Sequence, residues 1–293
     1  MNSDHTLDKR QVRHAFDRAA TGYDEAAVLQ REIYDRMLSR LEYIKFKPES
    51  ILDAGSGTGY GHHKLKHSYP SSQLVAIDIA LKMHLQARPT VAKWKQWLPT
   101  SGKHIQYVCG DIEQLPLGEQ CVDLVWSNLA LQWCNNLEHT FAEIHRVLRG
   151  DGLFMFSTFG PDTLKELRQA FSSADGYSHV NHFIDMHDVG DLLLHNGFST
   201  PVMDMEYLML TYNEVIDIMR DLKAIGAHNV TQGRRPGLMG KKTWQNAINQ
   251  YEMLRQSGKL PATYEVVYGH AWKPKRKESV LTPETRRQIG LGL

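Results

Sequence analysis

The chain has 293 residues, of which 42% are hydrophobic and 23% charged, proportions typical of a folded globular protein and not of a disordered one. Its 34 basic and 33 acidic residues nearly cancel, so the net charge does not point to nucleic acid as a partner. The three cysteines lack the spacing of a metal site, so we expect no bound metal. The sequence shows neither a signal-peptide pattern nor an apolar run long enough for a membrane span. We therefore expect a cytoplasmic protein.

Two helices are expected first in the chain, over residues 8–20 and 24–42, because apolar residues recur there at helical spacing. The sequence Thr21-Gly22-Tyr23 separates them. We assign residues 1–45 to an N-terminal helical cap.

Strand and helix patterns alternate after this cap. Such alternation is typical of βαβ units, so the sequence predicts an α/β, Rossmann-like fold with a mostly parallel seven-stranded sheet. The expected strands are residues 50–54, 73–78, 105–108, 121–127, 152–158, 202–209 and 263–271. The expected helices are residues 59–68, 80–88, 137–148, 162–174, 187–195, 213–225 and 241–256.

These elements divide the rest of the chain into segments. We expect the main Rossmann-like domain over residues 46–209 and a helical cap insertion over 210–262, which with the N-terminal helices roofs the ligand cleft. The last strand of the sheet (263–272) and a charged tail (273–293) follow. Residues 89–104 form an insertion to which the sequence assigns no function.

The most informative stretch is Ile-Leu-Asp-Ala-Gly-Ser-Gly-Thr-Gly-Tyr at residues 51–60. An apolar run ends in Asp53, and Gly55, Gly57 and Gly59 follow at every second position, where glycine permits a positive φ and close approach of a ligand. The spacing differs from the dinucleotide fingerprint Gly-x-Gly-x-x-Gly, and alone it also fits a purely structural turn. It resembles motif I of the methyltransferases that use S-adenosylmethionine (SAM), in which the loop supports the amino-acid end of SAM.

A second acidic residue, Asp78, closes the second predicted strand. A carboxylate at this place accepts hydrogen bonds from both ribose hydroxyls of a nucleoside; the alternative is a helix N-cap before Ala80. We assign Ile79 to the same site. Met83, about one helical turn further on, either faces the adenine or packs in the core.

Two further strand ends carry polar residues. Asp111 follows the third strand, where it can accept a hydrogen bond from the adenine amine while Ile112 packs on the ring; the alternative is ordinary turn chemistry. Asn128 ends the fourth strand, where cofactor and substrate would meet, or acts only as a cap. Taken together with the glycine loop, these residues resemble the class I SAM-dependent methyltransferases over about residues 48–160.

A narrower resemblance lies in residues 15–24, 126–134 and 219–229. These segments are similar to the malonyl-acyl-carrier-protein O-methyltransferase family of the biotin pathway. The resemblance implies that SAM methylates the free carboxyl of a malonyl thioester carried on an acidic acyl carrier protein. It also implies that the methyl ester hides the charge, so that fatty-acid synthesis can elongate the chain.

Methylation of a carboxylate needs no general base, because a carboxyl group with a reference pKa near 4 is already ionised at pH 7. The protein must align and desolvate it. The candidates are Tyr23, whose phenol either closes over the site or packs in the roof, and the cations Lys223 and Arg234, which either bind the carboxylate or are solvated. Trp133 either stacks on the thioester arm or fills the core.

Local basic pairs fit an acidic carrier, although they are also compatible with solvated surface. They are Arg234-Arg235, Lys241-Lys242 and the tail residues Lys273, Lys275, Arg276 and Lys277. We expect a monomer. Two other functions stay open at this point: a SAM-dependent methyltransferase acting on tRNA or a small metabolite, and a SAM-binding assembly factor similar to the mitochondrial complex I arginine hydroxylase.

Overall fold

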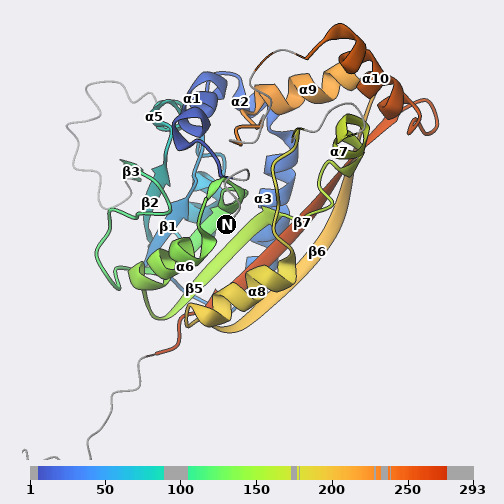
Figure 1. The fold of residues 1–293 in the computed structure, drawn as a ribbon. Coiled ribbons are helices and arrows are strands. Elements are labelled where there is room, and N and C mark those ends of the chain that lie inside the picture. The colour runs from blue at the N-terminus through green and yellow to red at the C-terminus, as the bar shows by residue number, and fades with distance from the viewer. Residues whose placement is uncertain are drawn as a thin grey trace, which may run out of the picture.

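The computed structural model describes residues 6–88, 105–172, 177, 179–227, 229–231, 237 and 239–275. Its centre is a seven-stranded sheet in the order β3-β2-β1-β4-β5-β7-β6 (Figure 1). The strands are β1 (Ser50–Ala54), β2 (Gln73–Asp78), β3 (Gln106–Cys109), β4 (Val122–Asn128), β5 (Leu148–Phe159), β6 (Ser199–Tyr212) and β7 (Leu260–Trp272). Neighbouring strands are parallel except that β7 runs antiparallel to β5 and β6. The predicted Rossmann-like, mostly parallel sheet is confirmed.

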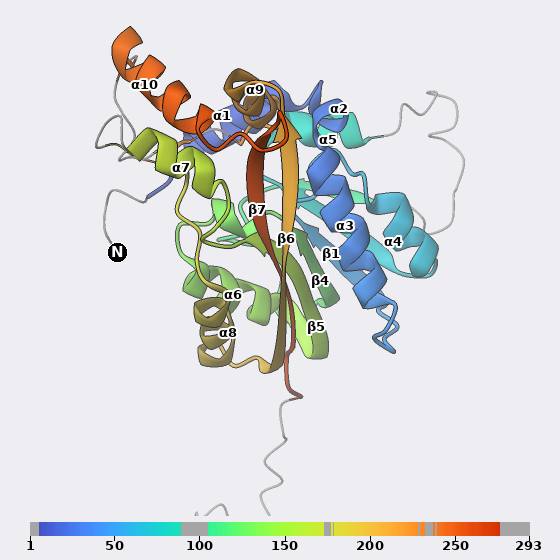
Figure 2. The same cartoon turned by 90° about the vertical axis from the view of Figure 1, so that its right-hand side faces the viewer.

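Helices cover both faces of the sheet and its upper end. They are α1 (Lys9–Ala19), α2 (Tyr23–Ala26), α3 (Val28–Leu41), α4 (His62–Ser68), α5 (Leu81–Ala87), α6 (Leu137–Val147), α7 (Lys165–Ser172), α8 (Met186–His195), α9 (Val215–Ala224) and α10 (Lys241–Glu252). Figure 2 shows α3 and α4 on one face, α6 and α8 on the other, and α1, α2 and α9 together above one end of the strands. No helix in the described ranges is long and apolar enough to cross a bilayer.

The central strand β1 is apolar because both of its faces are covered. Ile51 belongs to the core that includes α3, and the next residue, Leu52, belongs to the core on the side of α6. Side chains alternate between the faces of a strand, so a strand covered on both sides needs an unbroken apolar run. Asp53 interrupts the apolar run, and the strand ends at the next residue, Ala54.

Two of the helices in the first part of the chain differ from the prediction. The expected helix 24–42 is divided at Ala27, whose ψ of 43° lies outside the helical range, so α2 is a separate short helix that begins with Tyr23. Helix α4 also begins later than expected, at His62, because Gly59 has a left-handed φ of 78° that a right-handed helix does not accept.

The insertion between β6 and β7 holds α9 and α10, as predicted, but the two helices lie over different parts of the protein. Helix α10 packs against α7, where the rings of Trp244 and Phe171 make an edge contact at 5.8 Å. Helix α9 contacts α2 above the strand ends. Only α9 is therefore placed to contribute to a ligand site there.

Candidate active site

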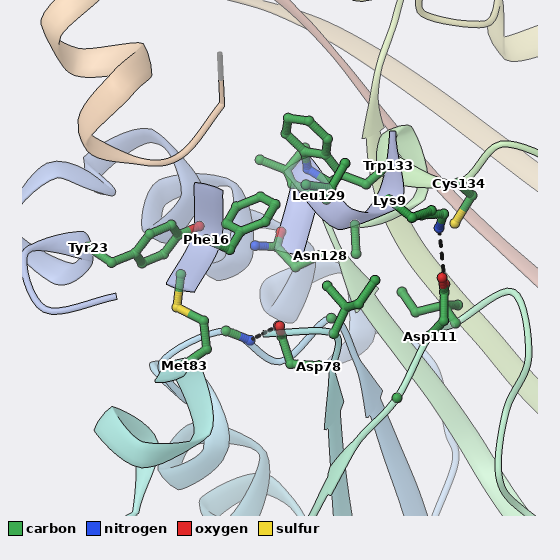
Figure 3. A pocket seen from close by; sticks show the side chains of 17 residues that line it. Lys9, Phe16, Tyr23, Asp78, Met83, Asp111, Asn128, Leu129, Trp133 and Cys134 are labelled. Atoms are coloured by element: carbon green, nitrogen blue, oxygen red, sulfur yellow. Dashed lines mark hydrogen bonds and ion pairs between the residues drawn. The ribbon is translucent and has the colours of Figure 1, made fainter. Parts of the chain in front are cut away.

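A cavity lies at the carboxyl ends of the parallel strands, beneath α1 and α2 (Figure 3). In open α/β sheets ligands bind at these ends, at the point where successive connections leave in opposite directions, here beside β1 and β4. The structure brings most of the predicted cofactor residues together around this cavity. They are Gly55, Gly57, Asp78, Ile79, Met83, Asp111, Ile112 and Asn128.

Asp78 is the buried anion of this first cavity, with 9% of its surface exposed. Its Oδ2 accepts a hydrogen bond from the Gly57 N–H (2.9 Å) and its Oδ1 one from the Ala80 N–H (2.8 Å). Burial raises the pKa of Asp78 to about 6, with Asp53 adding to the rise and the two backbone donors opposing it. Each oxygen keeps a free lone pair, so the carboxylate can still accept from ligand hydroxyls.

The glycine loop presents its backbone to the same space. A Cβ on Gly55, which has φ 81°, would lie 2.3 Å from the Cβ of Ala130, so this position requires glycine. A Cβ on Gly57 would meet nothing within 4 Å. Within the described ranges, the buried Ser56 hydroxyl has no hydrogen-bond partner. A loop with an unpartnered hydroxyl and open space at Gly57 fits a polar ligand lying along it.

Two predicted residues of the motif lie outside the first cavity. Asp53 lines a neighbouring cavity, called the third cavity below, together with Gly57 and Arg31, and its Oδ2 is 3.4 Å from His62 Nε2. A Cβ on Gly59 would lie 2.6 Å from the His62 ring, so this glycine allows the loop to pack on α4. Gly59 lines neither the first cavity nor this neighbouring one. Its role in cofactor binding stays a prediction.

Asp111 has a partner that the sequence did not indicate. Its Oδ1 accepts a hydrogen bond from Lys9 Nζ at 3.0 Å, and Lys9 also pairs with Glu113. Lys9 stands at the start of α1 and lines the first cavity (Figure 3). This pair joins the N-terminal helix to the end of β3 and leaves the second oxygen of Asp111 for a ligand amine. Ile112 and Met83, which line the same cavity, are buried and suit a flat ring.

Asn128 connects the sheet to α3. Its amide donates to the Gln30 carbonyl at 3.2 Å, and its Oδ1 accepts from the Ser157 hydroxyl at 2.8 Å. Asn128 lines both the first and the third cavity, which agrees with the expected position at the end of β4. Because both ends of its amide are engaged within the protein, the side chain is held in one orientation.

A second cavity adjoins the first on the side of α9. The two share Phe16, Tyr23, Leu129 and Trp133, and the rings of Phe16 and Trp133 meet edge-on at 5.1 Å. The described lining of the second cavity contains no Asp, Glu, Lys or Arg. Its polar groups are neutral and belong to Tyr23, Gln30, Gln132, Thr163, Asn181 and Tyr264.

Tyr23 lines all three cavities and stands where they meet. Figure 3 shows its ring beside Phe16, above Asp78 and Met83. Burial raises the pKa of the Tyr23 phenol, and the carboxylates of Asp78 and Asp24 raise it further. The hydroxyl therefore keeps its proton at neutral pH and acts as a hydrogen-bond donor.

The other two predicted catalytic residues are not brought to this point. Lys223 is exposed and lines an outer groove, and it is part of neither the first nor the second cavity. Arg234 lies outside the described residues. Their predicted contact with the substrate carboxylate stays a prediction, and for Lys223 the position argues against it.

Sequence reasoning missed several residues of the site. Lys9 is 102 positions from Asp111, and nothing local in the sequence indicates the contact. Asn181 is 7% exposed, and its Oδ1 has no hydrogen-bond partner in the part of the chain that the structure describes. A buried amide with a free acceptor facing a cavity is a ligand-binding candidate, although a single Asn in a loop gives no signal of it.

The described residues include no group of three or more His, Cys, Asp or Glu side chains positioned to hold a metal ion. The geometry instead fits SAM. The carboxylates of Asp78 and Asp111 face apolar walls suited to a nucleoside, and the loop with Ser56 and Gly57 would hold the amino-acid end.

Comparisons with known proteins agree with this site. Residues 52–156 match the family described as a methyltransferase domain. The malonyl-[acyl-carrier protein] O-methyltransferase of Nitrosospira multiformis is 64% identical over 99% of this chain and 97% of its own length. The enzyme of the same name from Gallionella capsiferriformans is 59% identical over 92% of each chain.

Solved structures share the fold at low sequence identity. A putative methyltransferase from Bacillus halodurans superposes with a TM-score of 0.54 at 17% identity, covering 81% of this chain and 97% of the other. Phosphoethanolamine N-methyltransferase 2 of Haemonchus contortus, in complex with SAM, superposes with a TM-score of 0.51 at 14% identity, covering 88% of this chain and 57% of the other. The chain belongs to the malonyl-[acyl-carrier protein] O-methyltransferase family and is a SAM-dependent O-methyltransferase.

Proposed function

We propose that the protein transfers the methyl group of SAM to the free carboxylate of a malonyl thioester on an acyl carrier protein. The methyl ester would serve the biotin pathway. The observation that supports this most is the neutral second cavity, which joins the cofactor cavity at Tyr23. Near-full-length identity to enzymes of this name favours the malonyl substrate over tRNA, a small metabolite or an assembly role.

SAM supplies an electrophilic methyl group on a positively charged sulfur when it is bound. The protein's task is to align the substrate carboxylate and remove its water, since the carboxylate is ionised at pH 7. Neutral donors suit this task. A strong ion pair would stabilise the carboxylate before reaction and lose that stabilisation as the neutral ester forms, whereas a neutral donor such as the Tyr23 hydroxyl orients it at a smaller loss.

The roof would act as a cap over both cavities. Phe16 of α1, Tyr23 of α2 and Leu222 of α9 line the second cavity, so the N-terminal helices and the first helix of the 210–262 insertion enclose it. We propose that this cap excludes water from the carboxylate, which strengthens hydrogen bonds to it. Helix α10 contributes no lining residue to the first or second cavity, so the cap comprises α1, α2 and α9.

Incubation of the purified protein with SAM and malonyl-carrier protein is expected to yield the methyl ester. Mass spectrometry of the carrier would show the gain of one methylene unit. Acetyl-carrier protein is the matched control, because it lacks the free carboxylate and should remain unmodified. Unmodified malonyl-carrier under conditions where SAM binding is detected by calorimetry would refute the proposed substrate.

Asp78→Asn is expected to weaken SAM binding by roughly tenfold to 100-fold, because hydrogen bonds to a buried carboxylate contribute about 1.5–3 kcal/mol. The NH₂ group of the new amide would also face one of the two backbone N–H groups, of Gly57 and Ala80, whose hydrogen bonds Asp78 now accepts. Isothermal titration calorimetry measures the affinity. Asp191→Asn, on the exposed side of α8, is the matched control and should bind as the wild type does.

The pH dependence of binding tests the same group. The pKa of Asp78 is raised to about 6, so the carboxylate is ionised at pH 7 and becomes protonated as the pH falls through 6. SAM affinity of the wild type should therefore be constant above pH 7 and fall by up to about tenfold per pH unit below 6. If SAM binding by the Asp78→Asn variant showed the same pH dependence as the wild type, Asp78 would be excluded as the group whose protonation weakens binding.

Tyr23→Phe is expected to lower kcat by about tenfold to 100-fold, because a hydrogen bond to a charged group is lost while the ring stays in place. SAM affinity should change by no more than about threefold, since the packing is retained. Steady-state rates and calorimetry separate the two effects. Tyr43→Phe serves as the control, because Tyr43 is 90% exposed and lines none of the cavities. A Tyr23→Phe enzyme with normal kcat would remove the hydroxyl from the mechanism.

A further inference from the structure

An open groove runs over the outer surface between α1 and α9, separate from the two cavities. Its floor consists of small or apolar residues: Ala15, Ala19, Gly22, Met219 and Ala224. Its charged residues are Arg18, Arg220 and Lys223, and no acidic residue is among its described lining. The protein as a whole has a net charge of only +1, so this positive charge is local.

The three cations are available to an outside partner. Arg220 pairs with Asp217 at 3.0 Å, but its side chain is 71% exposed, and exposed ion pairs are weak. Arg18 and Lys223 have no ion pair within the described ranges. They are exposed on α1 and α9 respectively.

Acidic residues near the groove are held by other groups. The Asp24 carboxylate accepts from the Thr58 hydroxyl, and the Asp17 carboxylate accepts from the Lys82 N–H at 2.9 Å. Asp221, on α9, is hydrogen-bonded to Tyr212. The carboxylates of Asp24, Asp17 and Asp221 are therefore held by groups outside the groove, and none of these three pairs with a cation of the groove.

The groove and the second cavity lie on opposite sides of the same short elements. On α9, Leu222 faces the cavity and Lys223 the groove; at the start of α2, Tyr23 faces the cavity while the preceding Gly22 faces the groove. The chain after α9 approaches α1 closely at Gly226, where an added Cβ would lie 3.2 Å from Phe16 Cδ1. Only a thin layer of side chains therefore separates the groove from the proposed substrate site.

We propose that this groove is the docking surface for the acidic carrier protein. An acidic segment of the carrier would lie on the apolar floor with its carboxylates beside Arg18, Arg220 and Lys223. Its thioester arm would pass between α2 and α9 into the second cavity. The inference rests on the proposed function for the substrate and adds the place where the protein part of that substrate binds. Opposite charges across such a contact raise the association rate and fix orientation.

The competing basic surface, Lys241-Lys242, lies at the start of α10. That helix packs against α7, and none of its residues lines the first or second cavity. A carrier bound there would have to extend its arm across the roof. The groove is therefore better placed than the α10 surface to deliver the arm to the second cavity.

The double variant Arg18→Glu/Arg220→Glu tests the proposal, with two substrates compared in parallel. For malonyl-carrier protein, KM should rise about tenfold or more, because attraction at two positions becomes repulsion. For malonyl-pantetheine, which lacks the protein, kcat/KM should stay within about twofold of the wild type. The rise in KM that the double variant causes for malonyl-carrier protein should become smaller in high salt, because salt screens exposed charges.

Lys241→Glu/Lys242→Glu is the matched control, with the same change of net charge. It should leave the KM for malonyl-carrier within about twofold of the wild type. A rise in KM caused by this control and not by Arg18→Glu/Arg220→Glu would overturn the groove as the docking surface.

An equal loss of rate with both substrates would point to damage of the fold. In that case the neutral variant Arg18→Gln/Arg220→Gln decides: a KM increase confined to the carrier supports the groove, and an unchanged KM contradicts it. Failure of the proposed function is distinguished by the wild type, which would then methylate neither substrate.

Discussion

The carboxylate of Asp78 joins the end of β2 to the glycine loop that follows β1. One oxygen accepts from the loop at Gly57 and the other from the start of α5 at Ala80, so the position of the anion is fixed by backbone groups. Burial raises its pKa to about 6, yet it remains ionised at pH 7. The loop, the strand ends and the roof helices surround this buried carboxylate, which can accept hydrogen bonds from the ribose hydroxyls of a cofactor.

Charge is distributed in three zones from this point outward. The carboxylates of Asp53, Asp78 and Asp111 lie around the first and third cavities, the second cavity is lined by neutral groups where it is described, and exposed cations lie outside on the α1–α9 groove. This order suits an anionic substrate on an acidic carrier. The cations attract it from solvent, and the neutral interior receives a carboxylate that becomes an uncharged ester.

The sequence was sufficient for most of the sheet and for the strand-end residues, because buried strands and glycine turns have strong local patterns. It was insufficient wherever a contact joins distant segments, as Lys9 does with Asp111. The sequence was also insufficient for the orientation of a helix, as Lys223 shows. Its motif is distinctive, but whether it faces the cavity or the solvent depends on how α9 is rotated against α1, which a local pattern does not determine. The break at Ala27 gave no signal either, since alanine favours helix.

We propose that cofactor and malonyl group occupy adjoining cavities that meet at Tyr23. A crystal structure with S-adenosylhomocysteine and malonyl-pantetheine tests this directly. We expect the nucleoside to lie between Asp78 and Ile112 in the first cavity. We expect the malonyl carboxylate to lie in the second cavity, within hydrogen-bond distance of the Tyr23 hydroxyl. A malonyl group bound outside the second cavity, with its carboxylate away from Tyr23, would contradict the account.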